Sequence, residues 1–178
     1  MLAPKWASNI GPLHNPYREG EDGMAGSVES RLSELGITLP PVPSPLGNYV
    51  PYTIAGNLVF IAGQGAITED GIKYAGRVGG DITLEDAQES ARLCAVNLIA
   101  IVKAACGGDL ERVVQCVKLG AFVHCGSDFK DHPKVINGAS DLLVAVLGDR
   151  GRHARFAVGA PSLPFGLSVE IDGVFEIG

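Results

Sequence analysis

Charged residues are scarce in this chain of 178 residues, of which only 19% are Asp, Glu, Lys or Arg. Soluble domains usually contain about 25% charged residues, so fewer charges are available here to cover the surface. The chain is nevertheless 46% hydrophobic, and this content excludes an intrinsically disordered protein, which combines low hydrophobicity with high net charge. The length is typical of one compact domain. We therefore expect apolar surface that either a membrane or a subunit interface covers.

Long uninterrupted hydrophobic segments are also absent. The longest stretch without a charged side chain, residues 35–68, is interrupted by five prolines and by several glycines. A membrane-spanning helix needs about 20 consecutive, mostly apolar residues, and this stretch contains no such block. The N-terminal residues MLAPKWASNIG lack the apolar centre of a signal peptide. We therefore expect a cytoplasmic protein with no membrane contact, and we expect a subunit interface to cover the apolar surface.

Basic runs and metal-ligand clusters are missing as well. The net charge is −6 and no basic run exceeds two residues, so binding to a phosphate backbone has little electrostatic support and we expect no nucleic-acid partner. The four cysteines have neither CxxC nor zinc-ligand spacing. We expect no metal and no cofactor, and we expect buried, reduced thiols at Cys94, Cys106, Cys116 and Cys125.

The chain divides into an arm and one domain. Residues 1–26 are rich in Gly, Pro and polar residues without apolar periodicity, which predicts an N-terminal arm that is at most partly ordered. Residues 27–178 form the predicted single domain. Its first part, residues 27–45, consists of a short helix that Ser27 caps and Gly36 ends, followed by a proline-rich lead-in.

Hydrophobic spacing predicts two long helices and several strands. The first helix begins with the capping pair Thr83 and Asp86 and ends before Gly107, and the second begins near Pro133 and ends at Gly148. Apolar runs predict strands at residues 58–62, 113–125, 154–160 and 167–175. Two helices on one face of a mixed sheet make an α+β fold. A symmetric oligomer could cover the other face.

Two charged residues stand in otherwise apolar strands near the C-terminus. Arg155 lies in HARFAVG and Glu170 lies in VEI. One interpretation is ordinary alternation, with both side chains on the solvated face of their strands. The other is a substrate site in which Arg155 binds a carboxylate and Glu170 holds a water molecule. Spacing alone leaves both open.

Longer motifs connect this region with a known family. The segments ARFAV, LP and VEI at residues 154–158, 163–164 and 169–171, together with LGNY and GNLVFIAGQ at residues 46–49 and 56–64, resemble the signature of the RidA/YjgF family of enamine/imine deaminases. The similarity extends from about residue 45 to the C-terminus, and the segments occur in the family's order. The NGASDLL and GRHAR segments resemble one subgroup of this family.

The resemblance implies a chorismate-mutase-like α+β fold and a homotrimer with clefts between adjacent subunits. In this family the arginine at Arg155 binds the substrate carboxylate, and the glutamate at Glu170 positions the attacking water. The resemblance also assigns the cleft lining to Tyr49, to the backbone of Gly63, and to Asn137, which is followed by a loop one residue longer than in the family. It also places Ala62 and Ala157 in the substrate site, where both depart from the family pattern: Ala62 replaces a hydroxyl residue, and Ala157 replaces a frequent cysteine.

Three functions follow from the resemblance and remain open at this point. The first is hydrolysis of 2-aminoacrylate-derived enamines and imines to 2-oxo acids and ammonia, an activity of the 2-iminobutanoate/2-iminopropanoate deaminase type. The second is a non-catalytic trimer that binds a small carboxylate metabolite in regulation or as a holdase. The third is the endoribonuclease or translation inhibitor activity ascribed to some L-PSP relatives, which the acidic charge disfavours.

The remaining candidates have weaker support. His124 and Cys125 are adjacent, so on a strand their side chains face opposite ways and cannot pair with each other. Gly63-Gln64-Gly65 lacks the third glycine and the following helix of a dinucleotide-binding loop. We expect His132 and His153 in loops near helix ends, and His153 could approach the cleft because it precedes Arg155 by two residues.

Overall fold

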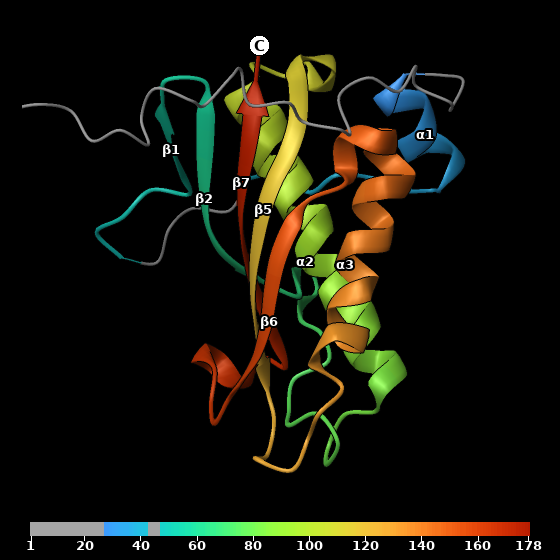
Figure 1. The fold of residues 1–178 in the computed structure, drawn as a ribbon, viewed down its shortest axis with the longest axis vertical. Coiled ribbons are helices and arrows are strands. Elements are labelled where there is room, and N and C mark those ends of the chain that lie inside the picture. The colour runs from blue at the N-terminus through green and yellow to red at the C-terminus, as the bar shows by residue number, and fades with distance from the viewer. Residues whose placement is uncertain (1–26, 43–46) are drawn as a thin grey trace, which may run out of the picture.

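A five-stranded mixed sheet, covered on one face by two long helices, forms the centre of the computed structural model (Figure 1). The structure describes residues 27–42 and 47–178, so the arm expected at residues 1–26 lies outside the described residues. The strand order is β1-β2-β7-β5-β6. Only β5 and β6 are parallel. The strands are β1 (Tyr52–Ala55), β2 (Leu58–Gly65), β5 (Val113–His124), β6 (Ala154–Ala160) and β7 (Val169–Ile177).

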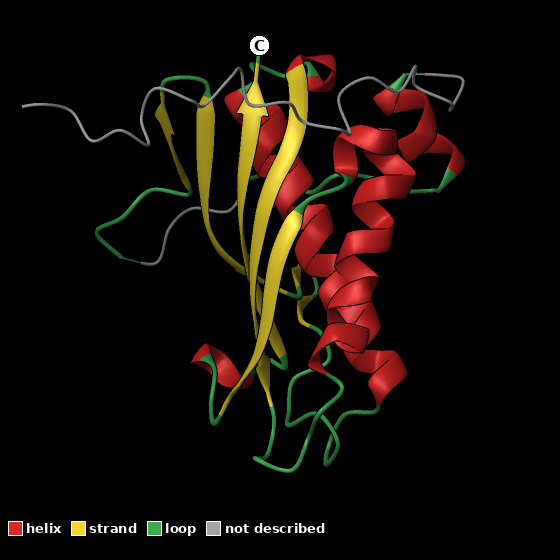
Figure 2. Cartoon of the chain, in the orientation of Figure 1, coloured by secondary structure: helices red, strands yellow, loops and turns green. Residues whose placement is uncertain are grey.

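The helices lie together on one side of this sheet (Figure 2). Helix α2 packs against β2 and β7, whereas α3 packs against β6 and β5, which places α3 next to the edge strand. The helices are α1 (Val28–Glu34), α2 (Leu84–Ala105) and α3 (His132–Leu147). Short elements join them: the hairpin of β3 (Ile67–Thr68) and β4 (Gly71–Ile72), and the 3-10 turns η2 (Leu110–Arg112), η3 (Gly148–Gly151) and η4 (Pro164–Gly166).

The helix ends follow the local chemistry of the sequence. The Ser27 hydroxyl accepts a hydrogen bond from the Ser30 amide at 3.2 Å, and the Thr83 hydroxyl accepts one from the Asp86 amide at 3.1 Å. Each hydroxyl thereby satisfies one of the amide groups that a helix N-terminus leaves without a partner. Gly148 has φ 65° where α3 ends, a conformation that favours glycine. The capping predictions are confirmed.

The predicted strands are largely confirmed, with shifts at their ends. The strand expected at residues 58–62 continues to Gly65, and the one expected at 167–175 is β7, which begins two residues later because η4 occupies the preceding turn. Strand β1 and the β3–β4 hairpin were not predicted individually. Both are short, and β1 is an edge strand with most of its residues exposed, so neither has a strong hydrophobic signal.

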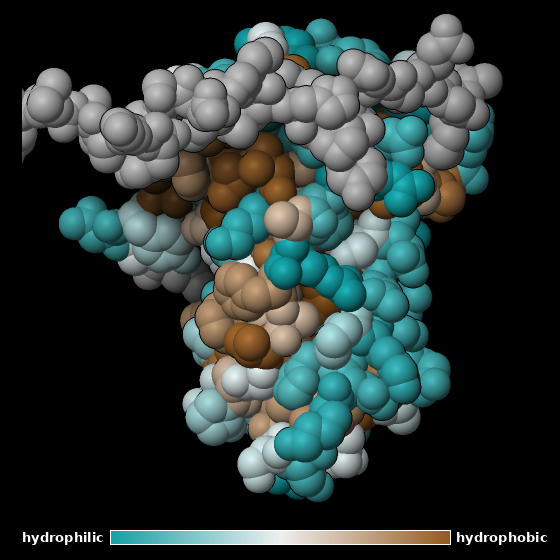
Figure 3. All heavy atoms as spheres, in the orientation of Figure 1, coloured by the Kyte–Doolittle hydropathy of each residue, from teal (hydrophilic) through white to brown (hydrophobic). Residues whose placement is uncertain are grey.

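The two faces of the sheet differ in what covers them. Alternate residues of β7 from Val169 to Ile177 are buried under the helices, and the intervening residues face away from them. On that open face, apolar side chains that are 38–43% exposed come from β2, on one side of β7, and from β5 and β6, on its other side. We call them the open-face patch: Phe60, Phe122, Phe156 and Val158. Figure 3 shows apolar surface over the strands and a mostly polar surface over α3.

All four cysteines are buried and unpaired, as expected. In the part of the chain that the structure describes, no helix combines the length and the apolarity needed to cross a membrane.

Candidate functional site

Arg155 lies on the helix-covered side of the edge strand β6, where α3 holds its guanidinium. Its Nη1 donates to the Ser140 hydroxyl at 2.8 Å, and its Nη2 donates to the Asn137 Oδ1 at 2.8 Å and to the Pro133 carbonyl at 3.1 Å. Asn137 and Ser140 are three residues apart, so they lie on one face of α3. The helix thus supplies three acceptors that orient the guanidinium at the protein surface.

His153 extends this network and has a defined tautomer. Its Nδ1 lies 2.7 Å from the Gly151 carbonyl, which can only accept, so Nδ1 carries the proton. Its Nε2, 3.1 Å from the Ser140 hydroxyl, therefore accepts from that hydroxyl. Burial lowers the pKa of His153, the Gly151 carbonyl opposes this effect, and the Arg155 charge adds to it. The imidazole is thus kept neutral, and Ser140 links it to Arg155.

The hydrogen bonds of Arg155 constrain how it can bind an anion. A guanidinium has five N–H groups in one plane, and each edge that can bind a carboxylate bidentately includes Nη2. Both N–H groups of Nη2 donate to the protein, one to Pro133 and one to Asn137. A bidentate carboxylate must therefore displace one of these acceptors. The exposed Asn137 side chain can rotate away, whereas the Pro133 carbonyl is fixed in the helix backbone.

Glu170 lies on the open face of β7, beside a bulge in β2. The pairing of β2 with β7 shifts register between Ile61 and Gln64, which leaves Ala62 and Gly63 outside the regular ladder. The Gln64 side chain stabilises this bulge, because its Nε2 donates to the carbonyls of Ala62 and Gly63 at 3.0 Å each. A Cβ at position 63 would overlap the Glu170 carboxylate. Glycine is therefore required there for the carboxylate to lie against the bulge.

The Glu170 carboxyl is in an environment that favours its neutral form. Burial raises its pKa, and the nearby Asp172 carboxylate, on the same face of β7, raises it further. A carboxylate that is partly desolvated is a stronger base than one in water. It can therefore accept a proton from a bound water molecule more readily than an exposed glutamate can.

Tyr49 and Ala62 line one shallow cavity of about 380 Å³, together with residues of β1 and β2. Its walls are mostly aromatic and aliphatic, and they include Tyr52 and Phe60. The Tyr49 side chain is exposed. Since Ala62 is adjacent to Gly63, this cavity continues the open-face region that contains Glu170.

The two charged residues of the candidate site lie on opposite faces of the sheet. Arg155 pairs with Leu119 of β5, and Glu170 pairs with Phe122. Leu119 and Phe122 are three residues apart, so their side chains point to opposite faces, with Leu119 in the core and Phe122 exposed. The interpretation that both charges lie on one solvated face is therefore wrong for Arg155. The structure brings together Arg155 and Asn137, separately Gly63 and Glu170, and in the neighbouring cavity Tyr49 and Ala62.

Ala157 belongs to the Arg155 half, because it lies two residues further along the same face of β6. Ser140 was not identified as a site residue from the sequence, although its spacing from Asn137 places it on the same helix face. His153 is in the loop before β6, as expected, whereas His132 is the first residue of α3 rather than a loop residue. Among the described residues, no group of three or more His, Cys, Asp or Glu side chains could hold a metal ion.

Comparison with known proteins places the chain in a family. The family described as "YjgF/chorismate mutase-like, putative endoribonuclease" matches residues 29–172. The chain belongs to this family, which confirms the resemblance seen in the sequence and the α+β fold with its mixed sheet.

Three relatives illustrate this membership. The chain is 41% identical to Protein TCP17 of Trypanosoma cruzi over 154 residues, which are 86% of this chain and 96% of that protein. A protein of unknown function from Agrobacterium tumefaciens is 50% identical, with a TM-score of 0.79 over 85% of this chain and 94% of the other. A "putative endoribonuclease" from Shewanella oneidensis is 35% identical, with a TM-score of 0.82 over 85% of this chain and all of the other.

Proposed function

We propose that this protein is a cytoplasmic hydrolase that deaminates small enamine and imine acids, such as 2-iminobutanoate and 2-iminopropanoate, to 2-oxo acids and ammonia. The observation that carries the proposal is that one chain presents a surface guanidinium, held by α3, and on the other face of the sheet a partly desolvated carboxylate against a glycine bulge. These two groups match a substrate that has a carboxylate next to an electrophilic C=N carbon.

The reaction needs only these side chains, the bulge and water. The Arg155 guanidinium binds the substrate carboxylate and displaces Asn137, which fixes the position of the C=N carbon. A water molecule held by Glu170 attacks that carbon, and one water proton passes through the carboxylate to the imine nitrogen, which gives a carbinolamine. Glu170 then takes the carbinolamine hydroxyl proton as the C=O bond forms. It passes this proton to the nitrogen as the C–N bond breaks, so ammonia leaves, the 2-oxo acid remains and the carboxylate is regenerated.

A second copy of the chain completes this site in the proposal. Arg155 and Glu170 lie on opposite faces of one sheet, so no substrate of a few atoms can contact both in a single chain. The open-face patch supports an assembly, because a row of exposed aromatic side chains is typical of an interface between proteins. A cyclic homotrimer would place the Arg155 half of one copy against the Glu170 half of the next.

The proposal is tested by following 2-oxobutanoate release from 2-iminobutanoate generated in situ. We expect Arg155→Ala to abolish the enzymatic rate, because the charge-assisted hydrogen bonds that hold the carboxylate are lost. Arg152→Ala is the matched control, since Arg152 is an exposed arginine that pairs with Asp149 on the same loop. Wild-type protein that does not exceed the buffer rate would overturn the deaminase. If such protein still binds 2-oxobutanoate through Arg155, the carboxylate-binding function replaces it.

Mixing two inactive variants tests whether the site spans two subunits. Arg155→Ala and Glu170→Gln chains, co-expressed in equal amounts with different tags, should recover about one quarter of the wild-type activity, because one random neighbour pair in four has both residues intact. Each variant assembled alone should remain inactive. If the mixed assemblies recover no activity, while native mass spectrometry shows that both chains are present in them, the shared site is contradicted.

A further inference from the structure

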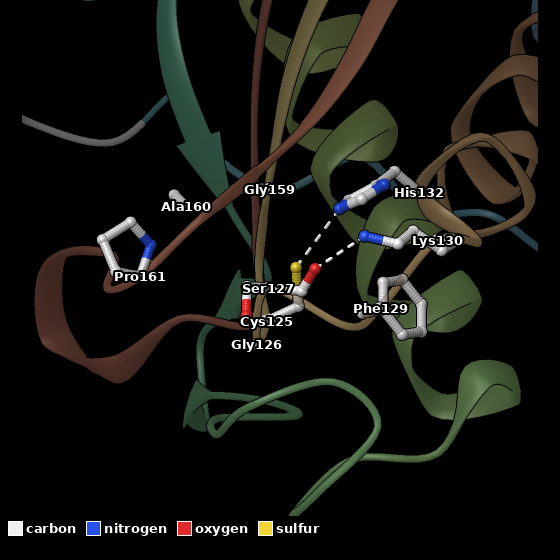
Figure 4. Close-up of a pocket in the computed structure, with 9 residues that line it drawn as sticks. All are labelled: Cys125, Gly126, Ser127, Phe129, Lys130, His132, Gly159, Ala160 and Pro161. Carbon is white, nitrogen blue, oxygen red and sulfur yellow. Dashed lines mark hydrogen bonds between the residues drawn. The ribbon is translucent and has the colours of Figure 1, made fainter.

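A cavity of about 330 Å³ opens at the C-terminal ends of β5 and β6, and none of the residues that line it is a hydrogen-bond partner of the Arg155 guanidinium. Figure 4 shows the Cys125 thiol, which follows β5, facing the His132 ring, which begins α3. Its lining residues are Cys125, Gly126, Ser127, Phe129, Lys130, His132, Gly159, Ala160 and Pro161. Neither the sequence motifs nor the proposed deamination assigns any role to this cavity.

The side chains of Cys125 and His132 lie close together, and neighbouring residues hold them in place. The Cys125 Sγ lies 3.3 Å from the His132 Nε2, within hydrogen-bonding distance for sulfur. The Phe129 ring contacts the imidazole edge-to-face, with 5.3 Å between centroids, which limits rotation of the ring. Gly159 leaves space for the pair, because a Cβ there would lie 2.8 Å from Nε2 and 2.9 Å from Sγ. Three separate elements thus position the thiol and the imidazole.

The facing imidazole offers the thiol a base. Burial raises the pKa of Cys125, a backbone hydrogen bond with Ala160 lowers it, and the charges of Asp128 and Lys130 act in opposite directions. The thiol is therefore protonated at neutral pH, and its proton must leave as sulfur forms a bond. A neutral His132 is the group at hydrogen-bonding distance that can accept this proton. The β6 side of the cavity, Gly159 and Ala160, has no titratable side chain.

The other cysteines lack this arrangement. Cys94 is fully buried and lies 3.8 Å from the Val169 carbonyl, and burial raises its pKa far above the usual value. Burial also raises the pKa of Cys116 to about 12, and it raises the pKa of Cys106. None of these three lines the cavity described here. Among them, Cys125 alone combines a facing histidine with access through a cavity.

We propose that the Cys125–His132 cavity is a second reactive site, at which the thiol forms a covalent bond with a small electrophile that bears a carboxylate. In the step, the thiol proton passes to Nε2 of His132 as Sγ bonds to the electrophilic carbon. With an alkyl halide, the carbon–halogen bond breaks and halide leaves. With an α,β-unsaturated acid, the C=C electron pair moves to the α-carbon, which takes the proton back from His132. Both reactions balance without an oxidant or reductant.

Size and charge select the electrophile. A cavity of about 330 Å³ is at the lower end of the range for small-molecule sites. The Lys130 ammonium points into it and donates to the Ser127 carbonyl at 2.6 Å (Figure 4), so two of its three N–H groups remain for an anion. An anionic reagent should therefore react faster here than a neutral one of the same size.

Iodoacetamide labelling of the intact protein, followed by peptide mass spectrometry, tests the site. We expect one modified residue, Cys125, before any other cysteine reacts. His132→Gln should slow this modification about 100-fold at neutral pH, the usual contribution of a general base. His124→Gln is the matched control, because the adjacent histidine points to the other face. Gly159→Ala, which places a methyl group against the Cys125–His132 pair, should also slow the labelling of Cys125. This variant tests the proposal if His132→Gln does not fold.

The pH profile and the reagent charge complete the test. Labelling of His132→Gln should depend more steeply on pH than labelling of the wild type, because without the imidazole only the ionised thiol reacts. Iodoacetate should be preferred over iodoacetamide in the wild type, and Lys130→Gln should remove that preference. Equal rates in wild type and His132→Gln, or no reaction of Cys125 in folded protein, would overturn the proposal. Cys125→Ser should leave deamination unchanged, so this test is independent of the proposed function.

Discussion

The helix-covered face and the open face of the sheet place charge in different surroundings. On the helix-covered face, Arg155 contacts three acceptors from α3, and its network includes a neutral histidine. On the open face, Glu170 lies beside Asp172 and next to the exposed Phe122. A strand with period 2 separates these environments by a single residue step. One sheet can therefore present a cation on one side and an anion on the other.

This difference between the two faces accounts for the low content of charged residues in the chain. The helix-covered face has its apolar residues in the core. The open face has an apolar patch and, on β7, the carboxylates of Glu170, Asp172 and Glu176, a combination that another copy of the chain would cover in the proposed assembly. The proposed site is thus the place where the two kinds of face meet between subunits.

Among the variants that separate the two faces, Glu170→Gln should have the largest effect on activity, because it removes the base from the open face. We expect kcat to fall about 100-fold or more, as for other general bases, while the affinity for 2-oxobutanoate changes little, since the Arg155 half remains. Steady-state kinetics and calorimetric titration measure the two quantities. Glu176→Gln, on the same face of β7, is the control. Unchanged kcat in Glu170→Gln would remove Glu170 from the mechanism.

Ser140→Ala should have a smaller effect, confined to the helix-covered face. The variant removes an acceptor from Arg155 and a donor from His153, and one hydrogen bond contributes about 1 kcal/mol, or about 5-fold. We expect KM to rise by about this factor with kcat nearly constant, because the guanidinium binds the carboxylate but does not act on water. Ser33→Ala, at an exposed helical serine, is the control. A fall in kcat alone would show that Ser140 acts elsewhere.

Asp172→Asn should have the smallest effect, a shift in the pH profile. Activity requires the Glu170 carboxylate, so kcat falls as the pH is lowered through the pKa of Glu170. Burial and then the Asp172 charge raise that pKa. Removing the Asp172 charge therefore lowers it, and the acid limb of kcat should move to lower pH. A pH–rate series in wild type and variant measures the shift, and movement to higher pH would contradict it.

Local signals in the sequence account for much of the fold. The caps at Ser27 and Thr83, the glycine after α3 and the apolar spacing of α2 and α3 act within a few residues, so their predictions were confirmed. The motifs around Arg155 and Glu170 likewise identified the family. The ends of β7 and the presence of β1 were harder to predict from the sequence, because they depend on pairing with distant strands rather than on local composition.

Contacts between residues that are far apart in the sequence could not be predicted from these local signals. Ser140 and His153 are thirteen residues apart and meet only because α3 packs beside β6. Cys125 and His132 also required the fold: the sequence correctly excluded a pair with the adjacent His124, but the loop after β5 brings the thiol to the start of α3.

The sequence by itself determined the class of fold, the family, and the two charged residues on which the proposed chemistry depends, since each rests on short-range patterns of residue type. Only the tertiary structure decided that Arg155 and Glu170 lie on opposite faces, because the face of a strand residue depends on its register with partners far away in the chain. In the proposed mechanism, two of the few charges in the strands, Arg155 and Glu170, therefore form two half-sites, one on each side of the sheet.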